Sequence, residues 1–141
     1  MRNKIVLLSF IISIVVVGAC KKAINNIKED LMVNLITSHT WKVVKFMEGT
    51  ANLTSEYSVY DFEFEKNSTV RAVLNGATPA TGTWVGDETT QSITASFPGA
   101  GTTISKLSGV WIVTNTKSAP WRVFSNRYEG SKQYVLDLQE K

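Results

Sequence analysis

The chain has 141 residues, with 15 basic and 12 acidic side chains, a single histidine and a single cysteine. One imidazole and one thiol are too few to build the usual nucleophile, base and orienter of a hydrolase, or a cysteine-containing metal site. We therefore expect neither an enzyme nor a cofactor. Residues 1–19 hold two of the basic side chains, so the rest carries 13 basic against 12 acidic residues. That balance leaves no basic stripe for nucleic acid.

The amino-terminal stretch has the pattern of a secretory signal peptide. Arg2 and Lys4 precede an apolar run that extends from Ile5 to Ala19. The run is roughly fifteen residues long, whereas a helix needs about twenty residues to cross the hydrocarbon core of a bilayer. A short apolar run behind positive charges is typical of a segment that directs export.

The end of this run resembles the bacterial lipobox, in which a branched apolar residue and two small residues precede a cysteine. Here these residues are Val17, Gly18, Ala19 and Cys20. The resemblance implies a lipoprotein, with a diacylglyceryl thioether on Cys20, cleavage before it and acylation of the new amino terminus. Ordinary signal peptidase cleavage and an uncleaved anchor are the two alternatives. Because two or more acyl chains anchor stably, we expect attachment to a membrane of the cell envelope.

The residues after the cysteine bear on which membrane this is. Lys21 and Lys22 follow it, whereas lipoproteins retained at the inner membrane often carry an aspartate there. The expected location is the outer membrane, with the domain facing the periplasm. The expected organisation is a signal peptide over residues 1–19, the lipidated cysteine and a helix over 20–38, and a β domain over 39–141.

An amphipathic helix is predicted over about residues 23–37. Apolar residues recur there at spacings of three and four, namely Ile24, Ile27, Leu31 and Leu35. The apolar stripe could lie on the membrane surface or cover one open end of the β domain. Glu29 and Asp30 would be repelled by anionic lipid, which favours the second interpretation.

Beyond His39 the apolar period changes to two, which predicts strands. In the clearest of them, Tyr60, Phe62 and Phe64 alternate with three acidic residues, which we expect to form a solvated face and not a calcium site. His39 itself, at the junction of helix and strand, is expected to be structural. The predicted strands cover residues 40–48, 57–66, 68–75, 80–86, 91–97, 108–115, 120–127 and 133–139.

The connections between these strands contain turn residues such as Asn75-Gly76 and Pro98-Gly99. Short connections make sequence neighbours antiparallel partners, as in an up-and-down meander. Pairing of the last strand with the first would remove the exposed edges. We therefore expect a mainly β fold, an eight-stranded antiparallel up-and-down barrel preceded by one helix, with a β-sandwich as the alternative.

Three tryptophans carry a resemblance to a known family. Trp41 opens the first strand after a helix, and a Gly-x-Trp pattern occurs at Gly82–Trp84 and again at Gly109–Trp111. Together with the lipobox, this resembles the small lipocalin-like, calycin-type domains of Gram-negative lipoproteins, over residues 35–141. One departure is His39, where lipocalins place a glycine. The resemblance implies an apolar pocket at the barrel mouth that takes a hydrophobic small molecule or lipid.

Two functional hypotheses follow. In the first, the barrel binds a hydrophobic or amphipathic small molecule. In the second, the interior is filled and loops over residues 49–56 and 98–107 contact another envelope protein, as an adaptor or inhibitor module. A void of about 300 Å³ or more would support the first hypothesis. The candidate residues for a cavity wall, which could equally be plain core packing, are Trp41, Tyr60, Phe62, Phe64, Trp84 and Phe97.

Overall fold

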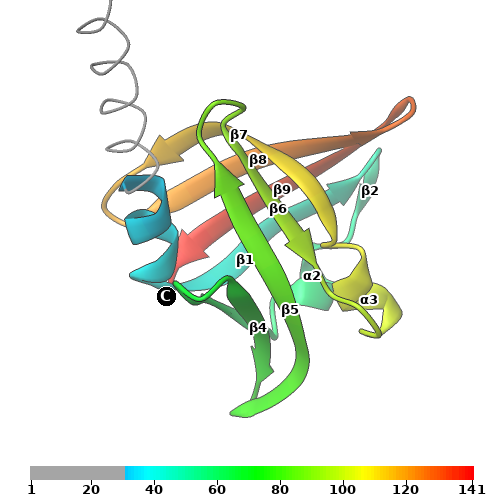
Figure 1. The fold of residues 1–141 in the computed structure, drawn as a ribbon. Helices are drawn as coiled ribbons and strands as arrows, with labels where there is room; N and C mark the ends of the chain where they lie inside the picture. The colour runs from blue at the N-terminus through cyan, green and yellow to red at the C-terminus, as the bar shows by residue number, and fades with distance from the viewer. Residues whose placement is uncertain (1–30) are drawn as a thin grey trace, which may run out of the picture.

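The computed structural model describes residues 31–141 (Figure 1). Cys20 and the signal segment lie outside the described residues, so lipidation remains a prediction. A helix occupies residues 31–37, which confirms the described part of the predicted helix. The strands that follow are β1 Thr40–Glu48, β2 Ala51–Asn52, β3 Asp61–Phe64, β4 Thr69–Leu74, β5 Ala77–Asp87, β6 Ser92–Ser96, β7 Gly109–Lys117, β8 Arg122–Glu129 and β9 Lys132–Glu140, with two helical turns, α2 Thr54–Tyr57 and α3 Thr102–Ser105, between them.

The sheet closes on itself as an eight-stranded antiparallel barrel. From β3 to β9 each strand pairs with the next in sequence, and β1 pairs with β3 on one side and with β9 on the other. The β1–β9 ladder extends from Trp41 opposite Glu140 to Glu48 opposite Tyr134. The two-residue strand β2 pairs with Met47 and Glu48 at the end of β1. Closure gives the backbone groups of the first and last strands their partners, so the barrel forms and the sandwich does not.

A bulge in β1 keeps its apolar side chains inside the barrel. The register with β9 shifts between Val43 and Lys45, at a point where simple alternation would turn Phe46 outward. The extra residue restores the phase. As a result Trp41, Val43 and Phe46 are all buried, with exposed fractions of 0%, 3% and 0%.

The predicted strand over residues 57–66 is wrong at its beginning. Tyr57 belongs to α2, and the strand itself is only Asp61–Phe64. The Tyr57 side chain is fully buried and its hydroxyl donates to the backbone oxygen of Thr103 at 2.8 Å. This long-range contact holds Tyr57 in a helical turn. The expectation that every connection is short is also wrong where α2 and α3 lie.

The two ends of the barrel are covered by different elements (Figure 1). At one end, called the helix end, the helix over residues 31–37 contributes Ile36 to the core, and the indole nitrogen of Trp41 donates to the backbone oxygen of Ile36 at 2.8 Å. This contact supports the interpretation of the helix as a cover. At the other end, called the loop end, lie α2 and α3.

Candidate functional site

A small apolar cavity lies in the barrel interior. Its volume is about 40 Å³, far below the roughly 300–1,000 Å³ of a small-molecule site. Ser125 is its one polar lining side chain, and the hydroxyl donates to the backbone oxygen of Leu136 at 2.9 Å. A water could fit by volume, but it needs two to four polar partners, which these walls do not offer. The cavity is therefore a packing gap in a filled core.

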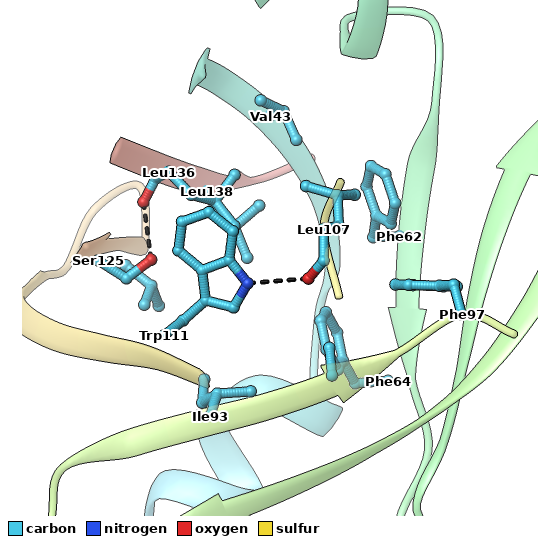
Figure 2. A pocket seen from close by; sticks show the side chains of 12 residues that line it. Val43, Phe62, Phe64, Ile93, Phe97, Leu107, Trp111, Ser125, Leu136 and Leu138 are labelled. Atoms are coloured by element: carbon cyan, nitrogen blue, oxygen red, sulfur yellow. Dashed lines mark hydrogen bonds between the residues drawn. The ribbon is translucent and has the colours of Figure 1, made fainter. Parts of the chain in front are cut away.

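Trp111 lies among the residues around this cavity (Figure 2). It projects inward from β7, and its indole nitrogen donates to the backbone oxygen of Leu107 at 2.8 Å. Leu107 follows α3 and is itself buried against the cavity. The hydrogen bond thus fixes the segment after α3 across the loop end, where it closes the interior.

The predicted cavity residues divide into two groups. Phe62, Phe64 and Phe97 line the cavity. Trp41, Tyr60 and Trp84 do not belong to its described lining. Trp41 is fully buried and bonded to the helix end, Tyr60 packs on Phe62 with ring centroids 6.3 Å apart, and the Trp84 indole meets Phe64 edge-on at 5.5 Å.

Most of the remaining lining is aliphatic and was not singled out from the sequence. Alternation in the predicted strands 91–97 and 133–139 already indicated that Ile93 and Ala95 share a face with Phe97, and that Leu136 and Leu138 share a face with each other. Trp111 could not be placed by the same rule, because its neighbours Val110 and Ile112 are apolar as well. The lining residues beyond the predicted set are Val43, Ile93, Ala95, Leu107, Trp111, Val123, Ser125, Leu136 and Leu138.

A buried arginine forms a polar layer toward the loop end. The guanidinium carbon of Arg127 lies 4.9 Å from the ring centroid of Trp111 and 4.2 Å from that of Tyr134. The side chain is 8% exposed, donates to the backbone oxygen of Ser108 and pairs with Glu129 at 3.2 Å. Stacking between two aromatic rings stabilises a desolvated cation. Arg127 thereby joins β7, β8 and β9 at this level of the barrel.

An ion-pair cluster ties the surface of the loop end together. The Glu48 carboxylate accepts from Lys106 at 2.8 Å and from Lys132 at 3.0 Å. These two hydrogen bonds lower the pKa of Glu48 to about 2. Because Lys106 follows α3 and Lys132 begins β9, the cluster links three parts of the loop end.

His39 has structural contacts. Its Nδ1 lies 3.1 Å from the backbone oxygen of Leu35, and its Nε2 lies 3.1 Å from the Glu140 carboxylate. These contacts join the helix to the first and last strands. The alternating acidic residues of β3 are also paired: Asp61 with Lys141 at 2.7 Å, and Glu63 with Arg71 at 2.7 Å.

Two searches of residues 31–141 bear on other kinds of site. Nowhere in this range do three histidine, cysteine or acidic side chains gather as they would around a metal ion. No helix of the same range combines the length and hydropathy that a membrane span requires.

Comparison with known proteins identifies a solved structure with a similar fold. No protein-family model and no curated protein matches the chain. Among solved structures, the crystal structure of a DUF4847 family protein from Bacteroides vulgatus ATCC 8482 is similar, with a TM-score of 0.51 and 16% identity over 78% of this chain and 97% of that one. At this identity the likeness concerns the fold alone: the chain shares the small β-barrel architecture of that protein.

Proposed function

We propose that this chain is a lipid-anchored protein of the bacterial envelope whose barrel is a packed scaffold and whose loop end binds another envelope protein. The observation that carries the proposal is the filled interior, with a cavity of about 40 Å³. A hydrophobic guest inside the barrel, the first of the two hypotheses, needs several times that space. The volume therefore favours the second hypothesis, a non-catalytic interaction module.

The tether orients the barrel. In the proposed lipoprotein, acyl chains on Cys20 hold the amino terminus at the bilayer, and roughly ten residues separate that cysteine from the described helix. This segment spans at most about 33–36 Å when extended, so the tether keeps the helix end within that distance of the membrane. The loop end points away from it, toward the compartment, which we propose is the periplasm.

The loop end is a preorganised surface, because its segments are held in place before a partner binds. The contact between Tyr57 and Thr103 and the Glu48 cluster hold its segments in place, which lowers the entropy cost of binding. Beside it, Tyr128 is 62% exposed on β8. Tyrosine is enriched among the residues that dominate the binding energy of protein interfaces.

Site-specific photo-crosslinking in cells tests the interface. A benzophenone amino acid is placed at Glu56 or Thr102, both exposed at the loop end, and at Val85 as a control on the outer wall of β5. The expected result is one shared adduct from Glu56 and Thr102 and none from Val85. Equal adducts from all three positions, or none from the loop end, would contradict the proposal.

Two further measurements separate the parts of the proposal. Labelled palmitate should enter the wild-type chain and not the Cys20→Ser variant, which checks the anchor independently of the interface. Native mass spectrometry of the acyl-free chain purified from its host should find no hydrophobic molecule retained within the barrel. A retained apolar ligand would restore the first hypothesis if it contacts Phe62 and Phe97 in the barrel interior.

A further inference from the structure

A second hollow lies outside the packed core, at the helix end. It is an open groove of about 820 Å³ between the helix over residues 31–37 and the end of β7, with Trp121 among its walls. This volume lies within the range of small-molecule sites, in contrast to the barrel cavity. Helix and β7 lie next to each other in Figure 1.

The helix and Ser38 present two adjacent pairs of side chains to this groove. Leu31 and Leu35 form an apolar row, and beside it lie Asn34 and Ser38, which follows the helix and donates its hydroxyl to the backbone oxygen of Asn34. Residues four apart lie above one another on a helix, so the apolar row is continuous. Leu31 is 64% exposed, a large apolar area to leave in water. One wall thus offers an apolar strip and a hydrogen-bonding strip side by side.

The facing wall repeats this division. Val113 and Trp121 supply apolar surface, and Gln91 and Thr116 supply an amide and a hydroxyl. Among the described lining residues only His39 and Glu88 are ionisable. A site with many neutral donors and acceptors and little charge suits a ligand whose polar part is uncharged.

A network of polar contacts holds the groove in shape. The Glu140 carboxylate accepts from the backbone nitrogen of Trp121 at 2.9 Å and pairs with His39 Nε2 at 3.1 Å. The backbone nitrogen of Glu140 donates to the oxygen of Trp121 at 2.9 Å. On the helix side, a Cβ on Gly86 would lie 2.7 Å from the terminal methyl of Met32, so glycine lets Met32 rest on β5. The walls are fixed before any ligand arrives.

We propose that this groove binds an uncharged amphiphile, a molecule with an apolar chain or ring and a neutral head that carries hydroxyl or amide groups. The apolar part lies along Leu31, Leu35 and Trp121, and the head reaches Asn34, Gln91 and Thr116. The inference is independent of the proposed protein interface, which occupies the opposite end of the barrel.

Binding is tested with the mature chain, residues 20–141, carrying Cys20→Ser so that no acyl chain competes. The probe is octyl β-D-glucoside below its micelle-forming concentration, and the readout is the indole N–H signals in ¹H–¹⁵N spectra. Trp121 should shift on titration. Trp111 should not, because its indole lies inside the barrel, where its nitrogen is bonded to the backbone oxygen of Leu107 at 2.8 Å.

Three comparison probes identify the ligand class. Methyl β-D-glucoside lacks the tail, octanoate carries a negative head and octyltrimethylammonium a positive one. We expect each to bind more weakly than octyl glucoside. Tighter binding of a charged probe would overturn the neutral-head assignment, and no Trp121 shift with octyl glucoside would overturn the site. Co-sedimentation with phosphatidylcholine vesicles that contain monoglucosyl diacylglycerol assigns a lipid as the source, whereas binding of the soluble probe alone assigns a free molecule.

Matched variants locate the site. Thr116→Arg and Asn34→Arg place a long side chain in the groove from opposite walls, and Thr81→Arg makes the same change as Thr116→Arg on exposed β5. Each groove variant should weaken octyl glucoside about tenfold, which corresponds to about 1.4 kcal/mol. Thr81→Arg should leave the affinity unchanged. Equal loss in all three variants, or no loss in a groove variant whose spectrum is native, would refute the location.

Discussion

A Cβ atom on Gly109 would lie 2.7 Å from the Cδ of Arg127, closer than real side chains approach. Gly109 also has a φ of 132°, a conformation that side chains rarely adopt. The missing side chain leaves room for the guanidinium that stacks on Trp111 at 4.9 Å. In this Gly-x-Trp pattern, the glycine therefore leaves space for the Arg127 side chain, and the tryptophan provides a ring on which its guanidinium stacks.

Gly109→Ala should destabilise the fold by about 2–3 kcal/mol, because it combines backbone strain with overpacking against Arg127. The free energy of unfolding in urea measures the effect. Gly101→Ala is the matched control, since its φ is −58° and a Cβ there meets no atom within 4 Å. The control should change stability by less than about 0.5 kcal/mol. Similar losses in both variants would contradict the role assigned to Gly109.

Tyr57→Phe removes the hydroxyl that donates to the backbone oxygen of Thr103 at 2.8 Å. The expected loss is about 1 kcal/mol in urea unfolding, with faster amide hydrogen exchange around α3. Tyr128→Phe removes the same group from a side chain that is 62% exposed and should be nearly neutral. If the exchange rates around α3 stay unchanged in Tyr57→Phe, the hydrogen bond does not couple the two loops.

Glu48→Gln should lower stability at pH 7, because the Glu48 carboxylate is held by two lysines. Its pKa falls from 4.5 to about 2 in the folded protein. A carboxyl group whose pKa is lowered by folding stabilises the folded protein at every pH above its unfolded-state pKa. This stabilisation is lost as the pH falls through about 2. The difference in urea midpoint between wild type and variant should therefore be constant above about pH 5 and vanish near pH 2. It should also shrink in high salt, since the pairs are near the surface. A difference that persists at pH 2 would exclude the ion pairs as its cause.

Asp137→Asn should have the opposite sign and stabilise the protein at pH 7. Burial raises the pKa of Asp137 more than Lys45 and Arg122 lower it. A raised carboxyl pKa means that ionisation costs stability, so the penalty appears as the pH rises through the folded pKa and is absent in acid. The thermal midpoint of the variant should exceed that of wild type at pH 7 and match it near pH 3.

Asp61→Asn is the comparison for this prediction. The hydrogen bond from Lys141 is the main cause that lowers the pKa of Asp61, so the same substitution there should destabilise at pH 7. Two Asp→Asn changes on one barrel are thus expected to shift the midpoint in opposite directions. Shifts of the same sign would show that burial and pairing do not distinguish the two carboxyls.

Local patterns were enough to predict most of the strands. Apolar residues at every second position need no knowledge of the partner strand, because side chains alternate across any strand. The first strand has the predicted bounds, Thr40–Glu48. Phe62 and Phe64 lie on the core-facing side of β3, as their alternation predicted. Turn residues and short connections then favoured the up-and-down order, and the prediction that the last strand pairs with the first is confirmed.

Patterns failed where a distant residue decides the local conformation. Tyr57 begins the second predicted strand out of phase with Tyr60, Phe62 and Phe64. Its contact with Thr103, 46 positions away, holds it in α2. Similarly, the bulge after Val43 depends on the register with β9. Trp41 and Trp84 look like cavity residues in sequence, but their indole nitrogens bond to the backbone at the helix and the β3–β4 turn.

The sequence by itself therefore determined the strand order, the inward residues of regular strands and, as a prediction that the described residues do not reach, the lipid anchor at Cys20. Only the tertiary structure decided that the barrel is filled and that the larger hollow lies outside it, beside the helix. The physical reason is that free volume is a sum over side chains from strands far apart in sequence. One inward tryptophan, Trp111, and one buried arginine, Arg127, occupy space that no local pattern assigns to them.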